Sequence, residues 1–473
     1  MLTNLNWLKT GEKFPPDCEM ERITMYTQNR KLFEGKQAEV YENSLERIQR
    51  IIGNFQNIIS YPVVLNYQRL MSVKVSDLLF GEPPTFKAEN QDELDSIMLD
   101  SDLLSMSNMV AIDVSRYGDG LFYVRHNGTI PVVEIATPPV WYPIVSPNNV
   151  KINTAHVLAF VYDSTLSVQI HTKGQCEYRT YGYDSGTIGN LISTDVQPTG
   201  LDDFAVVQIP NTITSDRATG LDDYGDVDSI ISELMVRIGQ VSKILDKHAS
   251  PSMQGPSSAL ERDPVSGEYR IKAGTYFTMD SKDDPNVAYI TWDGQLESNF
   301  KHIEKLTNML YTISEMGSAI FGDMSGGFGQ VASGTALKRM MTSALAKVNR
   351  IRQKFDVGLK KAIILCGNMR GVDLEDLSIT WQDGLPNDPK EEADIIKSRT
   401  KDAQTMSVKR ALMQFDGLSD EQSDDEIQTI NEEQVATNPA TPFVLQGASK
   451  QGEELNGDTG YDTGGDTGDS QAV

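Results

Sequence analysis

The sequence has few cysteines and no long apolar run. Its three cysteines, Cys18, Cys176 and Cys366, lie far apart and form no CxxC pair. This pattern excludes a disulfide framework and a thiolate metal site of known spacing, and it is typical of a reducing compartment. The longest apolar runs, such as AIILC at 362–366, are far shorter than the ~20 residues that span a bilayer. Since MLTNLNWLKTGEKFPP also lacks the features of a signal peptide, we expect a soluble protein made in a cytoplasm.

Nucleotide-binding motifs are absent as well, although one stretch comes close to them. Residues 320–340 read IFGDMSGGFGQVASGTALKRM, with four glycines between Gly322 and Gly329 and a fifth at Gly334. The spacing from Gly329 to Gly334 is that of a P-loop, but Thr335-Ala336 follows where the phosphate-binding lysine must stand. The expected element before the glycines is a helix instead of a strand. The stretch therefore argues against an NTPase.

The sequence also shows no catalytic or metal-binding spacing. The five histidines form no HExxH pattern or other ligand spacing: His126, His156, His171, His248 and His302. The tripeptide DTG, known from aspartic proteases, occurs three times near the carboxyl terminus. Those enzymes need their aspartates on two folded lobes, whereas these repeats lie in a Gly-, Asp- and Thr-rich tail without apolar period that begins at Ala436. We predict a disordered tail, no metal and no cofactor.

Acidic residues dominate the charge. The 473 residues include 67 acidic and 42 basic ones, which gives a net charge of -25. Such a surface repels phosphate backbones and acidic membranes, so it argues against a sequence-specific DNA reader. It suits a surface past which DNA moves without sticking.

The hydrophobic pattern predicts an α+β unit first. Amphipathic helices are expected at 41–59 and 59–84, where GEPP ends the second. From Met109 the pattern changes to short strands: 120–138 reads as a hairpin with its turn at Asn127-Gly128, and HVLAFVYD, TLSVQIHT and CEYRTYGY follow at the spacing of an antiparallel sheet.

Two long helices with a small β insertion are predicted next. One apolar stripe runs from Val227 to Leu245 and another from Leu296 to Ile320, each with helical spacing. The segment between them is rich in Pro, Gly and Ser, with strands expected at Tyr269–Phe277 and Val287–Trp292. The arrangement is either a projecting stalk with a cap or a helical hairpin packed into a globular domain. Periodicity alone favours the second.

A basic helix is predicted from Thr335 to Met369. Its apolar stripe consists of Leu337, Met341, Leu345, Val348, Ile351, Phe355, Leu359 and Ile363. Eight basic residues and Asp356 give its stretch 335–361 a net charge of +7. Pairing with acidic neighbours in the same chain or an adjacent subunit is favoured over contact with DNA, because so acidic a chain needs partners for its charges. The strand LSITWQDGLP and short helices follow.

In their order, these segments resemble the portal proteins of tailed bacteriophages, especially the type found in siphophages of Gram-positive hosts. The resemblance covers some 400 residues. It rests on RKLFEGKQAEVY, SDLLFGEPPTF, SRYGDGLFYV, YGDVDSIISELMVRIGQVSKILDK, SGTALKRMMTSALAKVNRIRQKFDVGLKKAI, ITWQDGLPND and TMSVKRALMQFDGLSDEQSDDEIQTINEE. The glycine-rich stretch is richer in glycine than the loop that the family has at this place.

The resemblance implies a portal fold with an α/β wing, a two-helix stem, a small β-containing clip, a tunnel loop and a short helical crown. The implied boundaries are wing 1–224, first stem helix 225–250, clip 251–295, second stem helix 296–320, tunnel loop 321–334, long wing helix and strand 335–385, crown 386–435 and tail 436–473. The implied channel residues are Met324, Ser325, Gly326, Gly327, Phe328, Gly329, Gln330 and Val331. The implied contacts to DNA or a neighbouring subunit are Lys338, Arg339, Lys347 and Arg350.

The implied function is a conduit without catalysis of its own. The protein would form a dodecameric ring at one capsid vertex, a channel for packaging and ejection of double-stranded DNA bound without sequence preference. Its partners would be the terminase large subunit, a head-completion or adaptor protein, and the major capsid and scaffolding proteins, with no membrane. It would reside in the virion after assembly in the host bacterial cytoplasm.

Two other functions stay open on the residues alone. One is a cytosolic α+β enzyme with an unrecognised site and a glycine-rich lid, and the other is a different viral ring or scaffold protein. A large ring with an axial hole separates a portal from a small globular enzyme.

Overall fold

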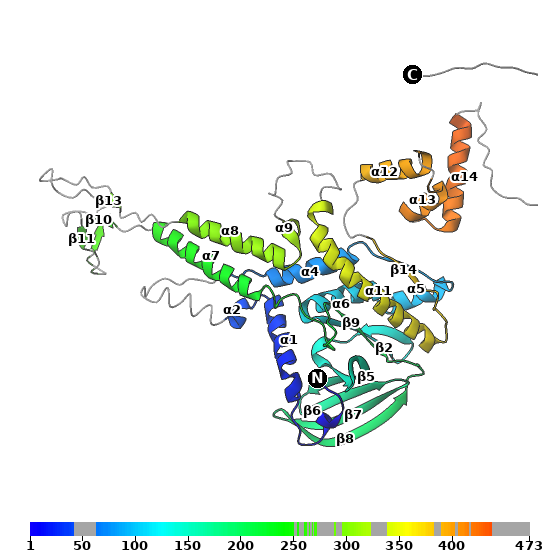
Figure 1. Ribbon diagram of the computed structural model, residues 1–473, viewed down its shortest axis with the longest axis horizontal. Coiled ribbons are helices and arrows are strands. Elements are labelled where there is room, and N and C mark those ends of the chain that lie inside the picture. Colours follow the sequence, from blue (N-terminus) through cyan, green and yellow to red (C-terminus); the bar gives the residue numbers. More distant parts are fainter. Residues whose placement is uncertain are drawn as a thin grey trace, which may run out of the picture. The chain divides into compact units, whose positions relative to one another are not determined.

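The computed structural model describes residues 1–41, 63–249, 296–322, 338–382, 389–402, 405–415 and 418–437, with isolated short stretches between 253 and 289. The chain divides into two compact units, 1–387 and 388–473. Helices and antiparallel sheets both contribute to the fold (Figure 1), which confirms the predicted α+β class. None of the helices in the described part is long and apolar enough to cross a membrane.

The amino-terminal part is helical, as predicted. After two single turns, η1 (Asn6–Leu8) and η2 (Asp17–Glu19), it contains α1 (Met20–Phe33), α2 (Gln37–Val40), α4 (Tyr67–Phe80), α5 (Gln91–Asp100) and α6 (Leu103–Tyr117). Asn66 and Asn90 cap α4 and α5, since their side chains accept hydrogen bonds from backbone N–H groups in the first turn. α4 ends where GEPP predicts an end. The helix expected at 41–59 falls almost wholly outside the described residues.

A three-stranded sheet with the order β3-β2-β9 forms the centre of the first unit. β2 (Asp119–His126) and β3 (Pro131–Ile135) make the predicted antiparallel hairpin, and β9 (Val206–Pro210) pairs with the other edge of β2. The turn uses Gly128 at φ 101°, a conformation that glycine adopts without strain. The Asn127 side chain accepts hydrogen bonds from the N–H groups of Thr129 and Ile130.

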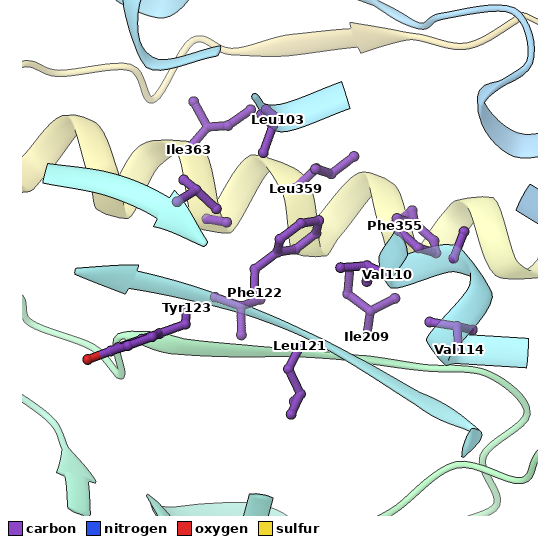
Figure 2. Close-up of a cluster of buried hydrophobic side chains, with 14 of the residues drawn as sticks. Leu103, Val110, Val114, Leu121, Phe122, Tyr123, Ile209, Phe355, Leu359 and Ile363 are labelled. Atoms are coloured by element: carbon purple, nitrogen blue, oxygen red, sulfur yellow. The ribbon is translucent and has the colours of Figure 1, made fainter. Parts of the chain in front are cut away.

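The main hydrophobic core lies between this sheet and α11 (Thr342–Arg370). Figure 2 shows Phe122 pointing from β2 toward α11, whereas Leu121 and Tyr123 point away from it. The predicted stripe of α11 is confirmed in its central part, because its residues are at most 2% exposed: Val348, Ile351, Phe355, Leu359 and Ile363. Gly358 allows close approach, since a Cβ there would come within 2.7 Å of the Ile209 side chain on β9. Leu337 lies outside the described residues.

A second sheet is a five-stranded antiparallel meander. Its strands follow in chain order: β4 (Trp141–Ser146), β5 (Asn149–Tyr162), β6 (Thr165–Thr172), β7 (Gln175–Asp184) and β8 (Thr187–Pro198). The three strands expected from HVLAFVYD, TLSVQIHT and CEYRTYGY are confirmed as β5, β6 and β7. Trp7, Leu8 and Phe14 of the amino-terminal segment pack in the core on one face of this sheet.

The two long helices lie side by side as a hairpin (Figure 1). α7 spans Asp228–Ala249 and α8 spans Leu296–Ile313. α8 was expected to continue to Ile320, and this expectation was wrong. The helix ends because Glu315 and Gly317 have φ of 59° and 73°, which no right-handed helix accommodates. The short helix α9 (Gly317–Ile320) then follows.

Only short strands are described between α7 and α8. β10 (Met253–Gln254) pairs with β13 (Ala288–Tyr289), and β11 (Leu260–Arg262) pairs with β12 (Tyr269–Ile271), both antiparallel. The two strands predicted in this insertion overlap β12 and β13, and their remaining residues lie outside the described part.

The first unit ends with a small two-stranded sheet, and the second unit is helical. β1 (Thr85–Lys87) pairs with β14 (Ser378–Thr380), which confirms a strand in LSITWQDGLP. The second unit contains α12 (Pro389–Lys397), a π-helical turn η5 (Ser398–Asp402), α13 (Val408–Phe415) and α14 (Asp420–Thr437). The tail after Thr437 lies outside the described residues.

Candidate functional site: the root of the helical hairpin

The predicted channel residues, Met324 to Val331, lie outside the described residues, but the chain on both sides of them is described. Before them, the Phe321 ring stacks on Tyr311 at 5.0 Å between centroids and meets Tyr67 edge-on at 5.6 Å. Met316 and Ile320 are buried in the main core. After them, Met341 packs partly buried against the same core. Described residues on both sides of the glycine-rich stretch are therefore packed in the first unit.

Lys347 lies at the centre of the hairpin root, by which we mean the base of the α7–α8 pair where Asp223 and Ser314 meet α11. Its ammonium lies 2.9 Å from the Asp223 carboxylate, and the side chains of this pair are only 6% and 7% exposed. The same ammonium donates to the Ser314 carbonyl at 3.1 Å. Asp223 lies shortly before α7 and Ser314 directly follows α8, so one side chain of α11 binds both ends of the hairpin. The predicted contact of Lys347 with DNA or a neighbouring subunit does not fit this burial.

Further hydrogen bonds satisfy the Asp223 carboxylate. It accepts from the Ser115 hydroxyl at 2.6 Å and from the Asn211 amide at 2.9 Å. Ser115 in turn accepts from Ser72, whose hydroxyl lies 2.7 Å from the Tyr224 hydroxyl. A buried charge needs such additional partners, because desolvation otherwise outweighs the attraction within the pair. The network joins α4, α6 and α11 to the segment that leads into α7.

Two other aspartates hold the start of α7 and the residues just before it. Asp222 accepts from the backbone N–H groups of Tyr224 and Gly225, both at 2.9 Å. Asp228, the first residue of α7, accepts from the Tyr41 hydroxyl at 2.8 Å and the Gln68 amide at 3.0 Å. Burial raises the pKa of both carboxyls above the ordinary aspartate value. The hydrogen bonds favour the charged form and offset part of this desolvation, which remains the larger effect.

The segment before Asp222 is fixed to the amino end of β2. Gly118 and Gly220 cross in direct contact: a Cβ on Gly220 would lie 1.9 Å from the Gly118 carbonyl oxygen. The buried Asp119 carboxylate accepts from the Gly220 N–H at 3.0 Å and from the Gln208 amide at 2.7 Å. Burial raises the pKa of Asp119 to about 6. No sequence pattern indicated this crossing, because its two glycines are far apart in the chain.

The remaining predicted basic residues differ from Lys347. Arg350 pairs with Glu315 at an exposed position, and Arg339 is exposed. Lys338 is half-buried. Elsewhere on α11, Lys360 pairs with Asp356 and Lys361 with Asp203. Pairing within the chain, the alternative favoured by composition, thus accounts for much of the basic face of α11.

A buried Cys–His pair lies in the five-stranded sheet, and it is not a reactive dyad. Cys176 and His171 face each other across β6 and β7, with Sγ and Nε2 3.8 Å apart. Burial raises the pKa of Cys176 to about 11 and lowers that of His171 to about 4. Both groups are therefore neutral at pH 7, whereas a nucleophilic cysteine requires a depressed pKa. Within the described residues, no group of His, Cys, Asp or Glu can hold a metal ion.

The contacts at the hairpin root have a structural role. They fix a two-helix hairpin to a mixed helix–sheet body through one buried ion pair, and residues on both sides of the glycine-rich stretch pack in the same unit. Lys347 could have been singled out from the sequence, because it lies one helical turn before the core residue Ile351. Its partner Asp223 could not, since nothing local relates two residues so far apart in the chain.

Comparisons with known proteins give one family match and several similar structures. The family model for "Phage portal protein, SPP1 Gp6-like" matches residues 13–440. None of the curated proteins matches the chain. Among solved structures, a chain of the neck of the native GTA particle, computed with twelvefold symmetry, is 10% identical, with 73% of this chain and 88% of that chain covered and a TM-score of 0.44.

Two further structures give similar values. A chain in the virion of the native gene transfer agent (GTA) particle is 10% identical, with 78% of this chain and 92% of that chain covered and a TM-score of 0.43. A chain in the neck of the empty GTA particle, computed with sixfold symmetry, is 9% identical, with 75% and 90% covered and a TM-score of 0.44.

Proposed function

The chain belongs to the SPP1 Gp6-like family of phage portal proteins, which are structural proteins and not enzymes, and on this premise we propose that it forms a ring of identical subunits at one vertex of a phage capsid. The ring is dodecameric in the virion, and the genome enters and leaves through its axial channel. The observation that carries the proposal is the family match over residues 13–440, which spans the sheets, the hairpin, α11 and most of the second unit.

The proposed layout follows the chain. Residues 1–224 and 335–385 form the wing, α7 and α8 the stem, 251–295 the clip, 321–334 the tunnel loop and 386–435 the crown. The hairpin root supports this layout, because a stem helix pair must be held at a defined angle to the wing if identical subunits are to close a ring. The ion pair between Lys347 and Asp223 ties the long wing helix to the root of the stem.

The proposed partners follow from the place in the particle. The clip binds the terminase large subunit during packaging and a head-completion or adaptor protein afterwards, and the wing meets the major capsid and scaffolding proteins. The ring is assembled in the cytoplasm of the bacterial host, and the phage is of the type with Gram-positive hosts. Double-stranded DNA passes without sequence-specific contacts, since a net charge of -25 on each subunit disfavours tight phosphate binding.

The tunnel loop is the proposed moving part of the channel. Its glycines leave the backbone free to change conformation as DNA passes, while Met324 and Phe328 narrow the channel. The anchored residues on both sides, Phe321 and Met341, confine this motion to the loop. Replacing Gly326, Gly327 and Gly329 by alanine should leave rings intact but reduce the yield of packaged DNA. Normal phage titre and full-length packaged DNA in that variant would contradict the proposed role.

The ring itself is tested with the purified full chain. Negative-stain images should show rings with an axial hole, and native mass spectrometry should give an integral multiple of the 52.4 kDa subunit mass. Isolated rings of another subunit number still support a portal. A chain that stays monomeric or dimeric under all conditions, including coexpression with a scaffolding protein, argues against it.

A further inference from the structure

A basic cleft lies beside α11 in the first unit, and its lining includes the Lys361–Asp203 ion pair. It has a volume of about 750 Å³ and is bounded by α11, β5, β9 with the loop before it, and the turn between β6 and β7. The residues that give it its chemical character are Lys173, Asp203, Pro210, Lys354, Val357 and Lys361.

The charges of this cleft are unbalanced. Asp203 is its one carboxylate, and it is shared by Lys361 at 2.6 Å and Lys173 at 3.5 Å. Lys354 is exposed, and no carboxylate within the described ranges pairs with it. Three lysines against one aspartate leave a net charge of +2, in a chain whose total is -25. The cleft is thus a place where an acidic surface gains attraction instead of repulsion.

The α11 side of the cleft also carries an exposed aliphatic side chain. Val357 is 67% exposed, although α11 packs its neighbour Gly358 tightly onto β9. Lys354 and Lys361 lie three residues before and four residues after Val357, so the three side chains share one face of the helix. A valine between two lysines fits a partner that combines carboxylates with an apolar contact.

We propose that this cleft is an interface between subunits and takes an acidic surface of a neighbouring copy of the chain. The inference rests on the proposed ring and names a contact within it. Copies with a charge of -25 repel one another, and a net-positive cleft offsets this repulsion where two of them meet. DNA fits less well, because Asp203 lies among the lysines and would face its phosphates. In a ring the contact is head-to-tail, so the cleft meets a different surface of the next copy.

Site-specific photo-crosslinking tests the contact directly. The full chain carries p-benzoylphenylalanine in place of Val357 and is irradiated as assembled rings. Covalent dimers should appear on a denaturing gel, and mass spectrometry should map the partner peptide to a segment rich in Asp and Glu. Dissociated subunits irradiated under the same conditions should give none. Rings that yield only internal crosslinks, or crosslinks to DNA in filled particles, would overturn the inference.

A pair of charge reversals tests the electrostatic part. Lys354→Glu should raise the subunit concentration at which rings dissociate by about tenfold. Lys87→Glu is the matched control, because it makes the same change at an exposed position on β1 outside the cleft. Equal shifts in both variants, or none in Lys354→Glu, would refute the cleft as an interface while wild-type rings still support the portal. Failure of the wild type to form rings would instead refute the proposed function.

Discussion

The hairpin root and the helices of the second unit differ in where their side chains find partners. At the root, buried polar groups from α4, α6, α11 and the segment before α7 bind one another, with Lys347 and Asp223 at the centre. In the second unit, the only buried side chains among those described are Ala411 and Ser423. α14 carries seven acidic residues and no basic one. The root is complete within one chain, whereas the described helices of the second unit leave most of their side chains exposed. Under the proposed ring, we expect neighbouring copies to cover part of them.

The largest expected effect comes from removing the ion pair at the hairpin root. Lys347→Met leaves the Asp223 carboxylate buried without its ion partner, so the free energy of unfolding should fall by about 3–5 kcal/mol. Chemical denaturation of the dissociated chain measures this loss. Adding Asp223→Asn should recover at least about 1 kcal/mol, because it removes the buried charge while the amide oxygen can still accept from Asn211 and the amide NH2 can donate to the Ser115 hydroxyl. A loss below about 1 kcal/mol would mean that the pair does not hold the root.

The next effect concerns pH and the buried Asp119. Its pKa in the folded chain, about 6, lies above the ordinary aspartate value of ~3.9. The folded state therefore binds this proton more tightly than the unfolded state does, so the contribution to stability is present below pH 4 and is lost as the pH rises through 6. The amide introduced by Asp119→Asn can still accept from the Gly220 N–H but does not titrate. Between pH 4 and 7 the wild type should lose about 2–3 kcal/mol relative to this variant.

The control for this experiment is an exposed aspartate. Asp424 pairs with Lys409 in the second unit, and its side chain is 61% exposed. Asp424→Asn should leave the pH dependence close to that of the wild type. Parallel pH profiles for Asp119→Asn and the wild type would contradict the burial of Asp119.

Local patterns predicted much of the framework of the first unit. The β2–β3 hairpin follows from Asn127-Gly128, and the helices α7, α8 and α11 follow from apolar residues at helical spacing. These features depend on residues within one or two turns of each other, which a sequence shows directly. The break after Ile313 was missed because the apolar period continues through Ile320, whereas the left-handed backbone at Glu315 interrupts the helix.

The root itself could not be predicted, because its contacts join distant parts of the chain. The basic face of α11 was recognised, but our prediction grouped the buried Lys347 with the exposed Arg350, although only Lys347 lies one turn before Ile351. Nor did the sequence show that Gly220 crosses Gly118, or that the Asp119 carboxylate accepts a hydrogen bond from the Gly220 N–H there. Such pairings depend on tertiary structure and leave no periodic signal. The glycine-rich stretch was singled out by composition, and its role in a channel stays a prediction.

A smaller effect is expected in the hydrogen exchange of the second unit. If its helices are completed by neighbouring copies, backbone amides in α12 should exchange about tenfold more slowly in assembled rings than in dissociated subunits. Amides in the centre of α11, which packs in the core of one chain, should differ much less. Hydrogen exchange with mass spectrometry measures both helices in the same sample. Equal exchange of α12 in rings and subunits would show that the second unit makes no contacts on assembly.

The smallest expected effect comes from the exposed counterpart of Lys347 on the same helix. Arg350 pairs with Glu315, and their side chains are 51% and 47% exposed. Arg350→Met makes the same kind of change as Lys347→Met, three residues away, but it leaves Glu315 in solvent. The free energy of unfolding should therefore change by less than about 1 kcal/mol. Denaturation of the two variants side by side isolates burial as the variable: similar losses would show that the basic character of α11 matters, and not the enclosure of Lys347 at the root of the hairpin.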